Sequence, residues 1–213
     1  MKPATATIGI LLLLLTYNSL AASRNCTVEE KAQADTQLLS LQDSRELKRD
    51  SLIKHLPFGV HGSSAGGEDE QILYQNGYVL SHDSNLKTTL WTSHKLTHTD
   101  IDNAAGKDRV NCFRRDPRMQ YSKSSSPADY NEPTYDQGHM TNDADLKDNL
   151  IEQINSYTMT NMSPQHCRFN RGIWLSLEHL IRIWAKAENY RNLYVTTGAV
   201  FNRDELNGRD KDS

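Results

Sequence analysis

The order of its hydrophobic patterns limits what this chain can fold into. Strand-like patterns occupy residues 71–80, 89–96 and 157–160, a helical pattern follows from Trp174 to Ala187, and a last strand pattern covers 193–197. In the helical segment apolar residues recur at spacings of three and four, at Trp174, Leu177, Leu180, Ile181 and Trp184. Because strands and helices do not alternate regularly, the sequence predicts an α+β fold, with an antiparallel or mixed β-sheet and packed helices.

Two local signals define the first half of the chain. Thr27-Val28-Glu29-Glu30 has the form of a capping box and predicts a helix in the charged segment up to Leu56, away from any active site. Asn76-Gly77 separates two short apolar runs and predicts a hairpin whose tight turn has positive φ at both central positions.

The first 22 residues have the pattern of a secretory signal peptide. Lys2 precedes an apolar run from Ile8 to Leu15, and Leu20-Ala21-Ala22 ends the segment. No later run approaches the roughly 20 apolar residues needed to span a membrane. We therefore expect a secreted chain without an anchor, with a helical extension at 23–56, one domain at 57–201 and a polar tail at 202–213.

Three cysteines follow the predicted signal peptide, and an odd number in an oxidising compartment leaves one without an intramolecular partner. Cys112 with Cys167 is the first pairing to test, which leaves Cys26 over. The cysteine spacing lacks the regularity of a zinc site. Asn25-Cys26-Thr27 is a glycosylation sequon near the predicted mature N-terminus.

Net charge argues against a protein that binds nucleic acid by bulk electrostatics alone, because the formal value is -3. Residues 107–123 are locally basic, with six basic residues against two acidic ones. An isolated cluster of this kind is usually a solvated surface. Its functional meaning depends on what lies beside it.

Three short motifs point to one chemistry. They are Tyr135-Asp136-Gln137-Gly138-His139-Met140, Thr160-Asn161-Met162-Ser163-Pro164-Gln165, and Phe169-Asn170-Arg171-Gly172-Ile173-Trp174 continuing to Glu178. Together they resemble the DNA/RNA non-specific endonuclease family, which includes secreted bacterial nucleases and mitochondrial endonuclease G. The resemblance covers about residues 57–201 and implies a ββα-metal finger active site.

His139 is the predicted general base. Its ordinary pKa of about 6.5 lets an imidazole accept a proton from water near neutral pH. The other seven histidines are interpreted as structural or surface groups. His94 and His98 are four residues apart but lie in a strand-like stretch, so they receive no metal-binding role.

Asn170 is the predicted metal ligand, since a neutral oxygen donor suits Mg²⁺ and leaves the charge of the ion available to phosphate. Mn²⁺ is an alternative. A helix N-cap is the competing interpretation of Asn170. The resemblance implies that Glu178, two helical turns later, holds metal-bound water, against a plain ion pair with Arg182. Arg182 suits phosphate clamping or stabilisation of the leaving group.

The resemblance assigns Asn161 a catalytic role in building the site around the base. An upstream arginine of the family corresponds to Arg109, although Arg114 or Arg115 fits equally well as a phosphate-binding residue. The family usually has Arg where this chain has Gln137. Losing that fixed charge predicts reduced or altered activity, partly offset by the amide of Gln137 and by neighbouring arginines.

The sequence as a whole thus predicts a secreted, Mg²⁺-dependent endonuclease acting on DNA and RNA with little sequence preference. The chain stops soon after the strand at 193–201, whereas family members continue, so the domain is expected to be incomplete at its C-terminus. The alternatives are a catalytically weakened nucleic-acid-binding protein on the same fold and a structural secreted glycoprotein. Preferred nucleic acid, biological role and oligomeric state stay open.

Overall fold

The computed structural model describes residues 23–59, 69–187 and 192–200. The predicted signal peptide at 1–22 and polar tail at 202–213 lie outside these ranges. No helix among the described residues is long and apolar enough to cross a membrane.

A four-stranded antiparallel sheet forms the centre of the fold, with strand order β2-β3-β4-β8. Its strands are β2 (Glu70–Tyr74), β3 (Val79–Asp83), β4 (Thr88–Leu96) and β8 (Leu193–Gly198). β3 and β4 are buried almost throughout. Beside this sheet, β6 (Tyr135–His139) pairs antiparallel with β7 (Met162–His166), and the short β1 (Ser23–Asn25) pairs parallel with β5 (Arg109–Asn111). The predicted α+β class with a mixed arrangement of strands is confirmed.

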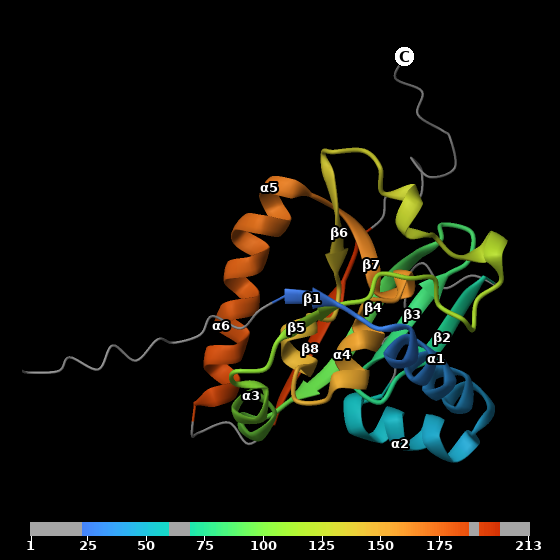
Figure 1. Ribbon diagram of the computed structural model, residues 1–213. Coiled ribbons are helices and arrows are strands. Elements are labelled where there is room, and N and C mark those ends of the chain that lie inside the picture. The colour runs from blue at the N-terminus through green and yellow to red at the C-terminus, as the bar shows by residue number, and fades with distance from the viewer. Residues whose placement is uncertain (1–22, 60–68, 188–191, 201–213) are drawn as a thin grey trace, which may run out of the picture.

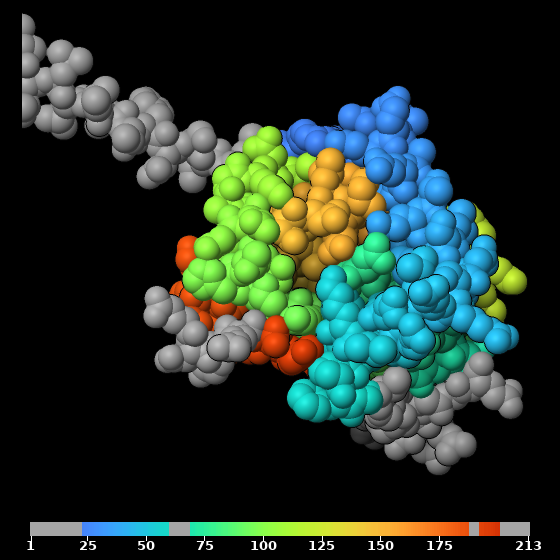
Figure 2. Space-filling model, turned by 90° about the horizontal axis from the view of Figure 1, so that it is seen from below, coloured from blue at the N-terminus to red at the C-terminus, as the bar shows by residue number. Residues whose placement is uncertain are grey.

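The longer helices lie on two sides of the sheet. The N-terminal pair lies opposite α6 in Figure 1. The α-helices are α1 (Val28–Asp43), α2 (Arg45–His55), α3 (His98–Ala104), α4 (Leu150–Ser156), α5 (Cys167–Phe169) and α6 (Leu175–Lys186). Shorter helical turns are η1 (Tyr121–Lys123), η2 (Pro127–Asp129), η3 (Asp143–Leu146), η4 (Met159–Asn161) and the π-helical η5 (Asn170–Trp174). From below, the orange surface of α4 lies between blue α1 and the green surface near α3 (Figure 2).

The predicted N-terminal helix is present, and its start is confirmed. Thr27 caps α1, its side chain accepting from the backbone of Glu30 while the Glu30 side chain accepts from the Thr27 N–H. The helix ends at Ser44, whose hydroxyl caps the next helix, α2, by accepting from Leu47 N. One predicted helix is therefore two.

The hairpin at Asn76-Gly77 forms, but not with the predicted turn. Positive φ angles among the described residues fall at Gly59, Lys87 and Gly106, not at Asn76 or Gly77. Helix α2 holds the turn instead, because Lys54 Nζ donates to the Asn76 carbonyl at 2.8 Å. Gly77 packs closely against the end of the Leu146 side chain, since a Cβ there would lie 2.9 Å from Cδ2 of Leu146.

The strand predicted at Tyr157-Thr158-Met159-Thr160 is wrong. Tyr157 is the C-cap of α4, and residues 159–161 form the 3-10 turn η4 before β7 begins at Met162. The segment is completely buried, so its apolar and β-branched side chains reflect burial rather than strand pairing. The predicted helix and last strand correspond to α6 and β8 and are confirmed.

The predicted disulfide is also wrong. Cys26 pairs with Cys112 across a Cα–Cα distance of 5.3 Å, and Cys167 is the free, half-buried thiol. The cause is the β1–β5 pairing, in which Asn25 lies opposite Asn111 and so brings the next residues, Cys26 and Cys112, together. Asn25 in the predicted sequon is exposed.

Candidate active site

Residues from distant parts of the chain line a cleft of about 330 Å³. Among the lining residues are six that the motifs predicted: Arg109, Gln137, His139, Asn170, Glu178 and Arg182. They come from β5, β6, η5 and α6. The fold therefore brings together the predicted base, the predicted metal ligands and two of the predicted arginines.

His139 ends β6, where it pairs with Met162 at the start of β7. The preceding Gly138 allows the side chain of Gln165 to cross β6, because a Cβ at position 138 would clash with that side chain. Gln165 Nε2 then donates to the His139 carbonyl at 3.4 Å. The glycine before the predicted base is thus required by close packing at the end of the strand.

The imidazole of His139 is held between aromatic rings. Its centroid lies 4.7 Å from that of Tyr157 in an edge contact and 5.8 Å from that of Phe113. Burial lowers the pKa of His139 to about 4; the negative charge of Asp143 opposes this shift, and the positive charge of Arg109 adds to it. The buried Nε2 has no hydrogen-bond partner. At neutral pH this histidine is therefore an uncharged acceptor whose Nε2 is not used by a structural hydrogen bond.

Arg109 is held at the cleft by Tyr157, one of the aromatic residues that contact His139. Its Nε donates to the Tyr157 hydroxyl at 2.6 Å, and the hydroxyl donates to Asp143 Oδ2 at 2.8 Å. Arg109 Nε also lies 3.2 Å from Asp143 Oδ2, while about half of the arginine side chain remains exposed. Asp143 and Tyr157 thus fix the arginine next to the histidine and leave part of it open to an anion.

Asn170 is oriented by a carboxylate rather than by a helix end. Its Nδ2 donates to Asp136 Oδ2 at 2.9 Å across to β6. Asn170 has helical backbone angles and α6 has no side-chain cap, so the N-cap interpretation is wrong. This bond uses the amide nitrogen of Asn170 and fixes the direction of its carbonyl oxygen, which remains available as an acceptor.

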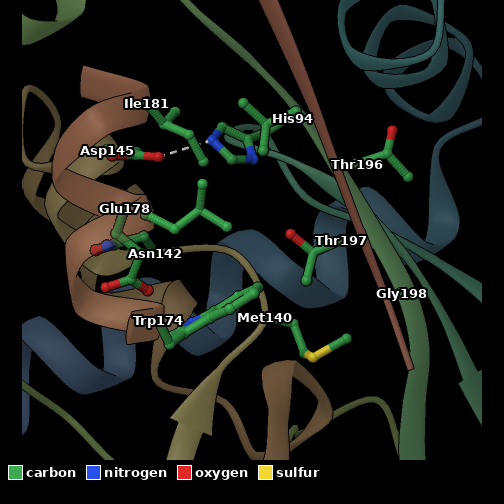
Figure 3. A pocket seen from close by; sticks show the side chains of 12 residues that line it. His94, Met140, Asn142, Asp145, Trp174, Glu178, Ile181, Thr196, Thr197 and Gly198 are labelled. Atoms are coloured by element: carbon green, nitrogen blue, oxygen red, sulfur yellow. Dashed lines mark hydrogen bonds and ion pairs between the residues drawn. The ribbon is translucent and has the colours of Figure 1, made fainter. Parts of the chain in front are cut away.

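Glu178 and Arg182 lie on α6, and each is influenced by Asp145. Arg182 Nη1 donates to Asp145 Oδ1 at 3.2 Å, so its ion pair is with Asp145 rather than with Glu178. Burial and the negative charge of Asp145 raise the pKa of Glu178 to about 7. Figure 3 shows a second pocket beside the cleft, which Glu178 and Ile181 of α6, Asn142, Trp174 and residues of β8 line.

The donor set fits a cation held by few protein ligands. Within the described ranges, no group of three or more His, Cys, Asp or Glu side chains is arranged to hold a metal ion. The cleft offers instead the oriented amide oxygen of Asn170 and the carboxylate of Glu178. Hard oxygen donors in small number suit Mg²⁺, which keeps several of its waters. The pKa of Glu178 is raised mainly by burial, and the negative charge of Asp145 adds to this effect more than the positive charge of Arg182 offsets it.

Two of the predicted phosphate-binding arginines lie elsewhere. Arg114 is 5% exposed and bonds Asp35, Asn155 and backbone carbonyls. Arg115 bonds the carbonyl of Ser124 and stacks on Tyr121. Neither lines the cleft. The side chain of Arg118 is fully buried against Asp116, so two of the six basic residues at 107–123, Arg114 and Arg118, form internal ion pairs.

Asn161 supports the site through hydrogen bonds to the backbone. It is completely buried, its Oδ1 accepts from Thr141 N at 3.0 Å, and its Nδ2 donates to the Thr141 and Ser156 carbonyls. It therefore fixes the chain just after His139, and it is not among the residues that line the cleft. Asn161-Met162-Ser163 also has the form of a glycosylation sequon, but the buried Asn161 side chain is not accessible to a glycan.

Sequence reasoning missed four polar residues that fix the site: Asp143, Asp145, Tyr157 and His94. None belongs to the quoted motifs. Asp143 and Asp145 follow closely after His139 in the sequence, and this spacing is the one signal that points to them. Tyr157 and His94 are brought to the site only by tertiary packing.

Strands β6 and β7 followed by a helix that carries cleft residues form a ββα unit with a basic, oxygen-rich cleft. The profile of the DNA/RNA non-specific endonuclease family matches residues 59–212, and the chain belongs to this family. The match begins after α1 and α2.

The chain is similar to nuclease C1 of Cunninghamella echinulata var. echinulata, with 31% identity over 148 residues that cover 68% of this chain and 56% of that protein. It is 28% identical to human mitochondrial endonuclease G over 141 residues, covering 65% of this chain and 46% of that protein. A chain in the crystal structure of the EndoG/EndoGI complex matches with a TM-score of 0.60 and 27% identity, over 72% of this chain and 60% of that chain. The chain thus spans about half the length of the curated relatives it matches.

Proposed function

We propose that the chain is a secreted, metal-dependent endonuclease that hydrolyses phosphodiester bonds of DNA and RNA with little sequence preference. One observation carries the proposal: uncharged His139 and the oriented amide of Asn170 line the same cleft as Arg109 and Arg182. Family membership supports the substrate class.

Asn170 Oδ1 and Glu178 would hold the cation, with Mg²⁺ preferred and Mn²⁺ as the alternative. When bound there, a divalent cation polarises a phosphoryl oxygen and stabilises the charge that develops on the leaving oxygen. Asp136 keeps the Asn170 amide in the required orientation by accepting its N–H. A carboxylate with a pKa near 7 is well suited to a positive partner.

His139 accepts the proton of the attacking water. Its low pKa keeps the imidazole uncharged at neutral pH, so no deprotonation step has to precede the reaction. Arg109, fixed by Tyr157 and Asp143, and Arg182, fixed by Asp145, bind the phosphate charges. Contacts of this kind are made to the backbone of the nucleic acid and carry no sequence information, which accounts for low specificity.

Secretion is supported by the apolar pattern at 1–22 and by the Cys26–Cys112 disulfide, since such bonds persist in oxidising compartments. Exposed Asn25 is the proposed glycosylation site.

The proposal is tested by digesting plasmid DNA and RNA with Mg²⁺, with a chelator, and with His139→Ala. Cleavage is expected only for the unchanged protein with Mg²⁺, and His139→Ala is expected to lower the rate about 10²- to 10⁴-fold. His98→Ala is the matched control, because His98 is 43% exposed and pairs with Asp102 outside the cleft. Equal, negligible cleavage in every arm would overturn the proposal.

The second candidate is a nucleic-acid-binding protein with weak catalysis. One contact favours it: Gln137 Nε2 donates to the Pro127 carbonyl at 3.2 Å, so the neutral amide that stands where the family usually has Arg is already engaged. Salt-sensitive binding of DNA without cleavage under any metal would support this candidate.

A further inference from the structure

We infer that Arg171 is a substrate-binding residue that donates to a phosphate of the nucleic acid beside Asn170, an inference that rests on the proposed function. Arg171 lines the same cleft as Asn170 and His139. It immediately follows Asn170 in the chain, and both side chains bind the carboxylate of Asp136.

Asp136 fixes the direction of the Arg171 guanidinium. Arg171 Nη2 donates to Asp136 Oδ1 at 2.6 Å and Nε donates to Oδ2 at 2.9 Å, so two parallel bonds hold one edge of the planar group. A guanidinium has five N–H donors. The N–H groups of Nη1 remain for a second anion, and the side chain is 71% exposed.

The other cleft arginines are more enclosed. The side chain of Arg109 is 49% exposed and that of Arg182 is 17% exposed. The arginine of the Arg171–Asp136 pair is open to solvent, and ion pairs at the surface contribute little to stability, so folding alone gives a weak reason for its bidentate geometry. A guanidinium held in one orientation can donate to a phosphate that lies next to the Asn170 carbonyl.

Among the described residues that line the cleft from β6 and η5, Arg171 is the one with a permanent charge, and its partner Asp136 on β6 is not among the lining residues. The cleft-lining residues from β6 and η5 are Gln137, His139, Asn170 and Arg171. Gln137 and Asn170 are neutral, and His139 is uncharged at neutral pH. Arg171 is therefore the cationic side chain here whose remaining N–H groups can donate to a phosphate.

Binding measured without divalent metal tests the inference, because cleavage is then absent and the metal contributes nothing. A fluorescent single-stranded DNA is titrated with the full chain in a chelator over a series of salt concentrations. Arg171→Gln is expected to bind about tenfold more weakly at low salt. The slope of log affinity against log salt is expected to fall by about 0.7, the value for one phosphate contact on single-stranded DNA.

Arg168→Gln is the matched control. Arg168 is an exposed arginine three residues earlier that does not line the cleft, so the change in net charge is the same. Its slope should equal that of the unchanged protein. Arg171→Lys keeps the charge without the fork and should retain the slope.

Each other outcome overturns the inference. If Arg171→Gln and Arg168→Gln have the same slope and affinity as the unchanged protein, Arg171 does not contact phosphate. If Arg171→Gln alters only the metal concentration needed for cleavage, the residue merely positions Asn170 through Asp136. If the unchanged protein itself has no salt-dependent affinity, the proposed function fails as well, which separates the two failures.

Discussion

His94 Nε2 lies 3.0 Å from Asp145 Oδ2, and both side chains are 2% exposed (Figure 3). The other oxygen of Asp145 accepts from Arg182. A histidine in the central sheet thus helps to fix the carboxylate that holds a cleft arginine. His94 received no role from the sequence, and its role is structural support for the site.

Asp145→Asn is expected to lower kcat about 10- to 100-fold with a smaller effect on KM. The substitution keeps the size of the side chain but removes the charge that holds Arg182, and a hydrogen bond to a charged group is worth about 1.5–3 kcal/mol. Steady-state cleavage rates with Mg²⁺ provide the measurement. Asp102→Asn, at an exposed aspartate paired with His98 and Lys186, is the control. A normal rate for Asp145→Asn would show that Arg182 does not act in the reaction.

Asp136→Asn is expected to raise the metal concentration needed for half-maximal cleavage about 10- to 100-fold. The reason is that Asp136 accepts the Asn170 N–H, and groups that orient a ligand commonly have effects of this size on metal affinity. The measurement is a Mg²⁺ titration of plasmid cleavage. An unchanged titration midpoint would contradict the assignment of Asn170 as the ligand.

The pKa of His139 makes folding stability depend on pH. It is about 4 in the folded protein and about 6.5 in an unfolded chain, so the unfolded chain binds the extra proton between these values. The free energy of unfolding therefore falls as pH is lowered from 6.5 to 4, by roughly 3 kcal/mol for the full shift. Urea unfolding of His139→Gln at pH 7 and pH 5 should show a shallower decline than the unchanged protein.

The matched control for that experiment is His98→Gln, because His98 is exposed. His55, whose pKa burial lowers to about 3, contributes equally in all three proteins and cancels from the comparison. Parallel declines in His139→Gln and the unchanged protein would contradict the buried, neutral state of His139.

The raised pKa of Glu178 predicts a different pH effect, on cleavage. Below about pH 7 the metal-free carboxylate takes up a proton, so metal binding competes with protonation. The acid limb of the rate profile should move to lower pH as Mg²⁺ is increased. Rates measured from pH 5 to 8 at two Mg²⁺ concentrations test this. A limb that does not move with metal would exclude Glu178 as a ligand.

The parts of the structure that the sequence predicts correctly depend on local patterns. The capping box at Thr27, the apolar spacing in α6 and the strand-like composition of residues 89–96 each act over a few residues. The motifs around His139, Asn170 and Glu178 also predicted residues that do share one cleft.

The errors come from long-range packing. Residues 157–160 have side chains typical of a strand. In the fold they form a buried turn instead, and their backbone pairs with the backbone of Arg114 as an isolated bridge. Arg114 has the charge of a phosphate ligand, yet Asp35 on α1 neutralises it in the interior. The Cys26–Cys112 bond follows from a parallel strand pair between residues 86 positions apart, which spacing alone does not indicate.

Replacing either disulfide cysteine is expected to destabilise the protein. Cys26 and Cys112 close a long loop and lie in a cluster with Ala34, Ile154 and Tyr157, so Cys26→Ser should lower the free energy of unfolding by about 2–4 kcal/mol. Because Tyr157 contacts the His139 ring, cleavage by Cys26→Ser should be lost at a lower temperature than cleavage by the unchanged protein. Thermal unfolding and residual cleavage after heating are the measurements. Cys167→Ser is the control, since that thiol is free, and it should unfold at the temperature of the unchanged protein. Destabilisation by Cys167→Ser, with none from Cys26→Ser, would instead favour a bond between Cys112 and Cys167.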